Sequence, residues 1–144
     1  MSVKSKFKFL PIFIVTWFSI SPLLVIYLSF KSPVASIFLP ILFLFFVIFF
    51  WLKVFRTRAF QVEIDESVII VKGCFGIGKS KIYRFNELDG FDTLFESGKL
   101  GLAEFLFILK NGKRIGGISS FYHVNYDKMK LLLQKDLVDL GERK

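Results

Sequence analysis

Two long stretches without a charged residue lie side by side near the start of the chain. Phe9–Phe30 contains 22 residues and Ser32–Leu52 contains 21, and only Lys31 separates them. At about 1.5 Å per helical residue, each stretch would reach about 30 Å, the thickness of the hydrocarbon core of a bilayer. A helix of this length in a soluble protein would need a polar face, which neither stretch has. The sequence therefore predicts two transmembrane helices.

The basic residues beside these stretches predict the orientation of the helix pair. Residues 1–58 carry no acidic residue, and only Lys31 lies between the two stretches. The other six basic residues flank the pair: Lys4, Lys6 and Lys8 before it, and Lys53, Arg56 and Arg58 after it. Because basic residues collect on the cytoplasmic side, we expect both termini in the cytoplasm and the turn at Lys31-Ser32-Pro33 outside. A cleaved signal peptide is the alternative for the first stretch, but the stretch is longer than usual and no A-x-A-like site follows it.

Charge and composition exclude several classes of function. The net charge is +8, but residues 59–144 hold thirteen basic and twelve acidic residues, so the excess belongs to the helix pair. A nucleic-acid-binding domain would carry that excess on its folded part, so no nucleic acid is expected as a partner. One Cys and one His exclude a disulfide framework and any metal site that needs two imidazoles. We expect no cofactor, no metal and no catalytic residue, and therefore no enzyme.

The remaining residues show the patterns of short strands. Phe60–Ile64 alternates apolar and polar side chains, and the pair Asn111-Gly112 is a strong signal for a two-residue hairpin turn. The expected strands are 60–64, 68–72, 81–85, 91–95, 104–110 and 113–119. About six antiparallel strands in so short a segment favour a small β-roll or barrel, joined to the membrane helices by a tether of a few residues.

A helix is predicted at the end of the chain. Asn125 is a suitable N-cap residue, and Gly141 is a suitable end. Between them, apolar residues recur at helical spacing: Tyr126, Met129, Leu133, Leu137 and Leu140, with Leu131 and Val138 on a second face. We therefore expect one amphipathic helix to close the β-rich part.

The order of these elements resembles that of pleckstrin-homology-like (PH-like) domains. Some small bacterial membrane proteins carry a two-helix hairpin directly before a PH-like domain, as this chain does. The segment Ile82–Leu88 is similar to the strand and turn in the middle of those domains. The resemblance implies a membrane α-hairpin over residues 1–58 and a mainly-β, cytoplasmic PH-like domain over residues 59–144. It also implies a location in the bacterial inner membrane.

The segment Gly73–Ser80 matches the phosphate-loop pattern G-x-x-x-x-G-K-[ST]. A phosphate loop needs a helix that begins at the Lys-Ser pair, because the amides of that helix bind the phosphates. The residues that follow, Lys81–Phe85, have the pattern of a strand instead. We therefore interpret the segment as a glycine-rich loop between two strands and do not expect nucleotide hydrolysis.

The same loop is the candidate site for an anionic lipid or a partner protein. Phe75 and Ile77 are expected at its apolar tip, and the base of the loop is basic. Basic residues near an anionic membrane surface contribute about 1 kcal/mol each. PH-like domains that bind phosphoinositides carry basic residues around a loop between early strands, which the spacing Lys79-x-Lys81-x-x-Arg84 loosely resembles. The candidate residues are Lys72, Phe75, Ile77, Lys79, Lys81 and Arg84. The acidic turn Asp65-Glu66 departs from the phosphoinositide pattern, and a solvated turn is the alternative.

The remaining His, Cys and acidic residues are expected to have structural rather than chemical roles. His123 precedes the final helix and is expected to mark its entry, and Cys74 is expected to be inert. The carboxylates Glu87, Asp89, Asp92 and Glu96 gather around a turn and are expected to form a solvated face rather than an acid–base pair.

The leading functional hypothesis is a non-catalytic membrane protein whose cytoplasmic domain binds a partner protein or anionic lipid. The alternative is an accessory subunit that assembles through its helix hairpin with a transporter or another membrane complex. The predicted spans contain no Asp, Glu, Arg or His, which argues against a transporter acting alone.

Overall fold

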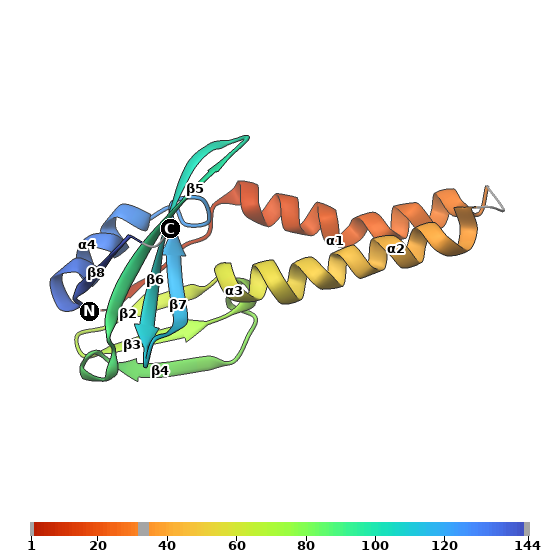
Figure 1. Cartoon of the computed structure of the whole chain (residues 1–144). Coiled ribbons are helices and arrows are strands. Elements are labelled where there is room, and N and C mark those ends of the chain that lie inside the picture. Colours follow the sequence, from red (N-terminus) through yellow and green to blue (C-terminus); the bar gives the residue numbers. More distant parts are fainter. Residues whose placement is uncertain (1, 32–34, 143–144) are drawn as a thin grey trace.

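The computed structural model describes residues 2–31 and 35–142, which form a helical hairpin and a β-rich part (Figure 1). The hairpin consists of α1 (Phe9–Ser29), α2 (Ala35–Phe49), a π-helix (Phe50–Phe55) and α3 (Arg56–Arg58), of which the last three are continuous. Two helices, Phe9–Ser29 and Ile37–Arg58, are long and apolar enough to cross a membrane. The predicted apolar hairpin followed by a β-rich region is thus confirmed, while residues 32–34 of the expected turn lie outside the described residues.

The contacts between the two helices include an aromatic pair and a polar contact. The rings of Phe18 and Phe50 lie 5.2 Å apart at their centroids in an edge-to-face arrangement. The indole Nε1 of Trp51 donates a hydrogen bond of 3.0 Å to Oγ of Ser19. A polar contact inside an apolar helix pair fixes the register of the two helices, because an unpaired indole N–H would be costly there.

Two four-stranded sheets make up the β-rich part. The first has the order β1-β2-β3-β4 and consists of β1 (Val3–Lys4), β2 (Gln61–Ile64), β3 (Val68–Lys72) and β4 (Ser80–Arg84). The second has the order β7-β6-β5-β8 and consists of β7 (Lys113–Ser119), β6 (Gly101–Lys110), β5 (Gly90–Gly98) and β8 (Asp139–Glu142). All neighbours are antiparallel except β5 and β8. Each of the six predicted strands is present, and β5 and β6 are longer than predicted.

The main hydrophobic core lies between the sheets and helix α4 (Tyr126–Asp136). Its most buried side chains come from alternate positions of β2, β3 and β6, from β7, and from one face of α4: Val62, Ile69, Leu106, Ile108, Ile118, Met129 and Leu133. Where β7 passes over β3, a Cβ atom at Gly116 would lie 2.7 Å from Cγ1 of Val71. Glycine is therefore required there for the two sheets to pack closely.

The predicted end of the last helix is wrong. Helix α4 ends at Asp136, and the chain is extended at Leu137 (φ −120°, ψ 151°) before it forms β8, which contains Gly141. The reason is a pairing with β5: the N–H of Phe91 donates to the carbonyl oxygen of Val138 at 2.9 Å. Gly90 allows this approach, since a Cβ atom there would lie 2.3 Å from the same oxygen.

The residues before α1 belong to the β-rich part. Beyond β1, the N–H of Ser5 donates to the carbonyl oxygen of Val62, and that of Lys8 donates to the carbonyl oxygen of Tyr122, both at 2.7 Å. Asn125 stands at the N-cap position of α4, as predicted, but its side chain does not cap the helix. The side-chain amide instead accepts from the N–H of Lys6 and donates to the carbonyl oxygen of Lys4, both at 2.9 Å. The hairpin is therefore attached to the sheets at both of its ends.

Candidate functional site

The glycine-rich loop between β3 and β4 is a compact turn. Gly73 accepts hydrogen bonds from the N–H groups of Gly76 and Gly78, both at 3.1 Å, and a short 3₁₀-helix covers Cys74–Gly76. Cys74 and Phe75 have positive φ values of 49° and 57°. The chain after the loop is β4 and not a helix. The loop therefore lacks the helix N-terminus that a phosphate loop uses to bind phosphate.

Phe75 points into the molecule, which corrects the expectation that it stands at the loop tip. Its N–H donates to the carbonyl oxygen of Ala59 at 2.8 Å, next to the end of α3. Its ring is half-buried and lies 5.2–6.3 Å, between centroids, from the rings of Phe7, Trp51, Phe55 and Tyr122. Phe75 therefore joins the loop to the helices by aromatic packing.

Ile77 is the apolar residue that the loop presents to the outside. Its side chain is 78% exposed. It lines an apolar recess of about 400 Å³ together with Thr16, Ser19 and Ile20 of α1 and Trp51. The loop tip therefore lies beside the apolar helices, as a membrane-facing loop would require.

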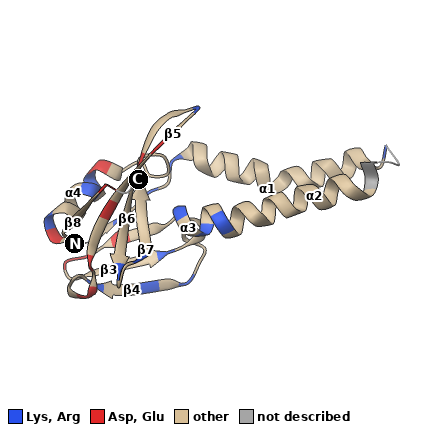
Figure 2. Ribbon diagram, in the orientation of Figure 1, with Lys and Arg blue, Asp and Glu red and all other residues tan. Residues whose placement is uncertain are grey.

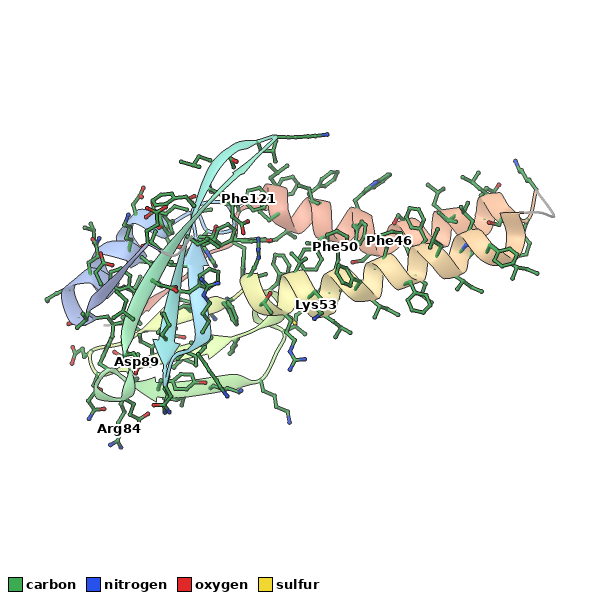
Figure 3. All side chains as sticks on the ribbon, in the orientation of Figure 1. Phe46, Phe50, Lys53, Arg84, Asp89 and Phe121 are labelled. Carbon is green, nitrogen blue, oxygen red and sulfur yellow. The ribbon has the colours of Figure 1, made fainter. Side chains whose placement is uncertain are left out.

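The structure brings together only some of the predicted basic residues. Lys79 follows the loop tip, and Lys72 is half-buried at the end of β3 and paired with Ser80. Lys81 is exposed on β4, the edge strand of the first sheet. Arg84 lies at the other end of β4, remote from the helices (Figure 3), and at about 3.3 Å per residue it is roughly 17 Å along the strand from Lys79. A single cluster of all four basic residues is therefore not formed.

A second hydrophobic core joins the helices to the second sheet. It contains Val15 of α1, Phe55 and Ala59 at the end of the helix pair, Phe105 and Phe107 of β6, and Tyr122. Burial raises the pKa of the Tyr122 hydroxyl, so this side chain stays neutral. We call this region the junction; it holds the β-rich part against one end of the hairpin.

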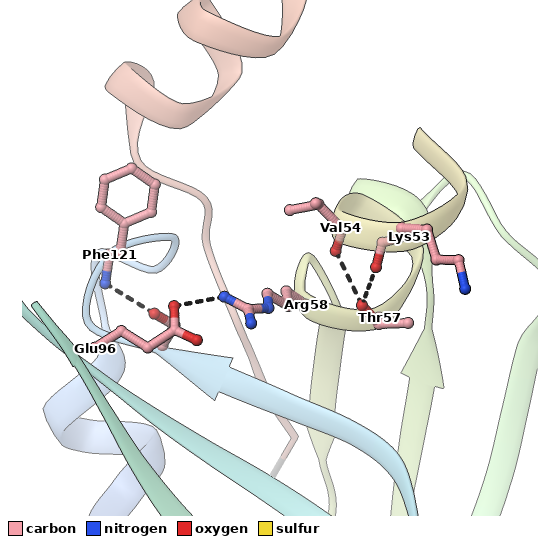
Figure 4. A network of polar contacts seen from close by, with 7 residues as sticks. Lys53, Val54, Thr57, Arg58, Glu96 and Phe121 are labelled. Atoms are coloured by element: carbon pink, nitrogen blue, oxygen red, sulfur yellow. Dashed lines mark hydrogen bonds and ion pairs between the residues drawn. The ribbon is translucent and has the colours of Figure 1, made fainter. Parts of the chain in front are cut away.

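Polar contacts at the junction close the end of the helix pair (Figure 4). Arg58 forms an ion pair with Glu96 of β5, and its guanidinium lies 5.6 Å from the ring centroid of Phe105. The hydroxyl of Thr57 donates to the carbonyl oxygens of Lys53 and Val54. Both carbonyls belong to the last turns of this helix, so the Thr57 side chain folds back onto its own helix.

A cavity opens beside the junction. Its volume is about 630 Å³, and it lies between the start of α1, the end of α3, the β5–β6 hairpin and the segment after β7. Its charged lining residues are Lys8, Arg58, Glu96 and Lys99. No sequence pattern pointed to this site, because its residues come from four separate parts of the chain.

The other residues singled out in the sequence have structural partners. The carboxylates of Glu87, Asp92 and Glu96 form ion pairs with Lys110, Arg114 and Arg58, and Asp89 accepts from the N–H of Gly112 at 2.7 Å. The prediction of a solvated face is wrong for Asp92, which is 2% exposed. The hydrogen bond from Lys110 lowers the pKa of Glu87.

His123 is buried in the loop before α4. Its Nδ1 accepts from the N–H of Ser119 at 3.0 Å, and its Nε2 lies 2.8 Å from the carbonyl oxygen of Phe60. Burial lowers the pKa of His123 to about 4. As a neutral imidazole, the side chain thus links the loop before α4 to the end of β7 and to Phe60, which directly precedes β2.

Within residues 2–31 and 35–142, no three His, Cys, Asp or Glu side chains gather in a way that could hold a metal ion. The lone cysteine, Cys74, is half-buried. Comparison with known protein families, with curated proteins and with solved structures gives no match for this chain.

Proposed function

We propose that this chain is a non-catalytic integral membrane protein whose cytoplasmic PH-like domain binds anionic lipid or a partner protein at the membrane surface. The distribution of charge supports membrane insertion (Figure 2). Among the described residues, Lys31 at the far end of the hairpin is the one charged residue that lies outside the β-rich part and the adjacent end of the hairpin. The exposed surface of the helices is almost entirely apolar, including Phe38 and Phe45, which are 80% and 71% exposed. Such surfaces belong in lipid.

The basic residues support an orientation with both termini in the cytoplasm. Lys8 directly precedes α1, and Lys53, Arg56 and Arg58 lie where the second helix ends. Both groups are therefore on the side of the hairpin that carries the sheets. By the positive-inside rule this side is cytoplasmic, and a bacterial inner membrane is the proposed location.

The topology supports the PH-like assignment. Consecutive antiparallel strands form one sheet from β2 to β4 and a second from β5 to β7, and α4 follows and packs on the core between them. Two additions distinguish this chain from the simple pattern: β1 enters from before the first helix, and β8 pairs in parallel with β5.

One observation carries the functional proposal: the junction fixes the β-rich part against the end of the apolar hairpin. Phe75 packs on Phe55 and Tyr122, and Arg58 pairs with Glu96, so the domain is not a free body on a tether. The loop carrying Ile77 and Lys79 is therefore held at the level where the helices would leave the bilayer. A contact held in place in this way needs little intrinsic affinity.

The proposal is tested by the depth of Ile77 in a bilayer. The full chain is used, because residues 3–8 complete the first sheet. A fluorophore is attached through Ile77→Cys, in a Cys74→Ser background, and the protein is placed in vesicles that contain lipids with a quencher near the headgroup. We expect strong quenching at position 77 and none at a matched label on Asn86, which is exposed at the remote end of β4. Equal quenching at the two positions, or none at 77, would overturn the proposal.

Orientation is tested separately by a reporter fused after Lys144. A cytoplasmic signal is expected, because six of the seven basic residues of 1–58 lie outside the turn. A reporter inserted in the turn after Ser32 should give the opposite signal. An external signal from the C-terminal reporter would contradict the orientation.

A further inference from the structure

The β5–β6 hairpin extends beyond the rest of its sheet. Its strands pair from Gly90↔Leu109 to Gly98↔Gly101, whereas β7 pairs with β6 only from Phe105 onward. The end of the hairpin, residues 96–103, therefore has no third strand beside it. In Figure 1 this end projects toward the start of α1, and the cavity at the junction lies between the two.

The tip of this hairpin has the composition of a membrane-contacting loop. Leu100 and Leu102 are each 70% exposed, and Lys99 stands beside them. The first residue of α1, Phe9, is 79% exposed. Exposed leucine and phenylalanine side chains next to lysine are suited to the boundary between headgroups and acyl chains.

The cavity beneath the tip is positively charged. Lys8, Arg58 and Lys99 line it, and Glu96 is its acidic residue, already paired with Arg58. Three positive charges and one negative charge leave an excess of two. A phosphate group accepts hydrogen bonds from several cations at once, so it suits this arrangement.

An apolar slot lies between the helices, next to the cavity. The slot has a volume of about 280 Å³, and it shares Phe121 and Tyr122 with the cavity. Its other walls are Pro11, Ile14 and Phe18 of α1 and Phe50, Val54 and Phe55 of the π-helix. Figure 3 shows Phe121 near the start of α1 and Phe50 farther along the hairpin. A basic cavity next to a charge-free slot has the two-part chemistry of a phospholipid.

We propose that the junction binds one anionic phospholipid, with its phosphate between Lys8 and Lys99 and part of one acyl chain in the slot lined by Ile14 and Phe50. The tip leucines then enter the bilayer next to the bound lipid. This inference rests on the proposed membrane location, but it assigns the lipid to a site separate from the Ile77 loop. An acidic peptide or a free phosphate would use the basic cavity and leave the slot unfilled.

The test uses the full chain in a neutral detergent, with dioleoyl-phosphatidylglycerol, dioleoyl-phosphatidylcholine or inorganic phosphate added. Native mass spectrometry counts the lipids retained, and the melting temperature is followed as each probe is titrated. We expect one retained phosphatidylglycerol and a rise in melting temperature that neither phosphatidylcholine nor phosphate produces. Equal effects of the two lipids, or an effect of phosphate as large as that of phosphatidylglycerol, would overturn the proposal.

Two pairs of variants locate the site. Lys99→Gln at the exposed tip should weaken retention of phosphatidylglycerol about fivefold, whereas Lys113→Gln, at the opposite end of the sheet, should not change it. Ile14→Trp should fill the slot and reduce retention, whereas Ile26→Trp, on an exposed part of the same helix, should leave it unchanged. Unchanged retention in Lys99→Gln, or equal losses within either pair, would overturn the assignment.

The test of the junction site and the tests of the proposed function can fail independently of each other. Retention in detergent does not depend on orientation, so an external C-terminal reporter together with specific retention would contradict only the orientation. Quenching at position 77 without specific retention would contradict only the junction site.

Discussion

His123 should make the folded chain sensitive to mild acid. A carbonyl oxygen can only accept a hydrogen bond, so the Nε2 atom facing Phe60 carries the proton, and Nδ1 is free to accept from Ser119. A second proton on Nδ1 would remove that acceptor and place a charge where the side chain is 0% exposed. The cost of burying this charge lowers the pKa of His123 to about 4 in the folded chain.

The size of the effect follows from the two pKa values of His123. In the unfolded chain its pKa returns to about 6.5. As the pH falls from 7 to 5, the unfolded chain therefore takes up a proton that the folded chain does not bind. The free energy of unfolding should fall by about 2 kcal/mol over this range, and the loss should end below about pH 4. At roughly 4 °C per kcal/mol, the melting temperature should fall by about 8 °C.

The assay is thermal unfolding of the full chain in a neutral detergent at several pH values between 7 and 5, followed by circular dichroism. His123→Gln is the control, because glutamine keeps one acceptor and one donor but does not titrate. The variant should be less stable at pH 7 and much less dependent on pH. Glu87, whose pKa is lowered, stays ionised in the folded chain over this range. Parallel pH profiles for the two proteins would refute the reasoning.

Two further predictions concern packing, and both are measured as melting temperatures of the full chain. Phe75→Ala should lower the free energy of unfolding by about 2 kcal/mol, because replacing a fully buried phenylalanine by alanine costs about 3–5 kcal/mol and this ring is half-buried. Ile77→Ala is its control: this residue is in the same loop but exposed, and its loss should change the free energy of unfolding by less than about 0.5 kcal/mol. Gly116→Ala should cost about 1–3 kcal/mol, because the new methyl group would overlap Val71. Gly98→Ala, with no atom within 4 Å of the added Cβ, is its control. Equal effects within either pair would contradict the packing described.

Local patterns predicted much of the fold. The alternation in Phe60–Ile64 marked β2, and the Asn111-Gly112 pair formed the expected hairpin turn, with φ values of 53° and 73°. The two uncharged stretches became the two apolar helices. In each case the signal lies within a few neighbouring residues, so no knowledge of distant contacts was needed.

Strand β1 shows why other parts were missed. Val3, Ser5 and Phe7 face inward while Lys4, Lys6 and Lys8 are exposed, which is the alternation of a strand. The same lysines also satisfied the positive-inside rule, and that explanation hid the strand. The end of α4 was missed for a related reason: Leu137 and Leu140 continue the helical spacing, but pairing with β5 across the sheet decided their conformation.

The candidate site was the least predictable part, because the direction in which a loop side chain points depends on the residues that it packs against in the fold. Nothing near Phe75 in the sequence shows that its ring packs against Trp51 and Tyr122. The residues of the junction cavity are equally scattered, from Lys8 to Lys99 and beyond. The extended β5–β6 tip, with Gly98 and Gly101, lies beyond the strands predicted at 91–95 and 104–110.

The two attachments of the hairpin determine how the domain can act. The chain enters α1 from a strand of the first sheet, and it leaves α3 at Ala59, which is buried in the junction. Two separate connections restrict rotation of the domain about the helix axis, which a single tether would leave free. In the proposed orientation, the Ile77 loop and the β5–β6 tip would therefore meet the membrane together. A change that weakens the junction should reduce lipid contact at both positions, even when the substituted residue, such as Phe75, touches no lipid itself.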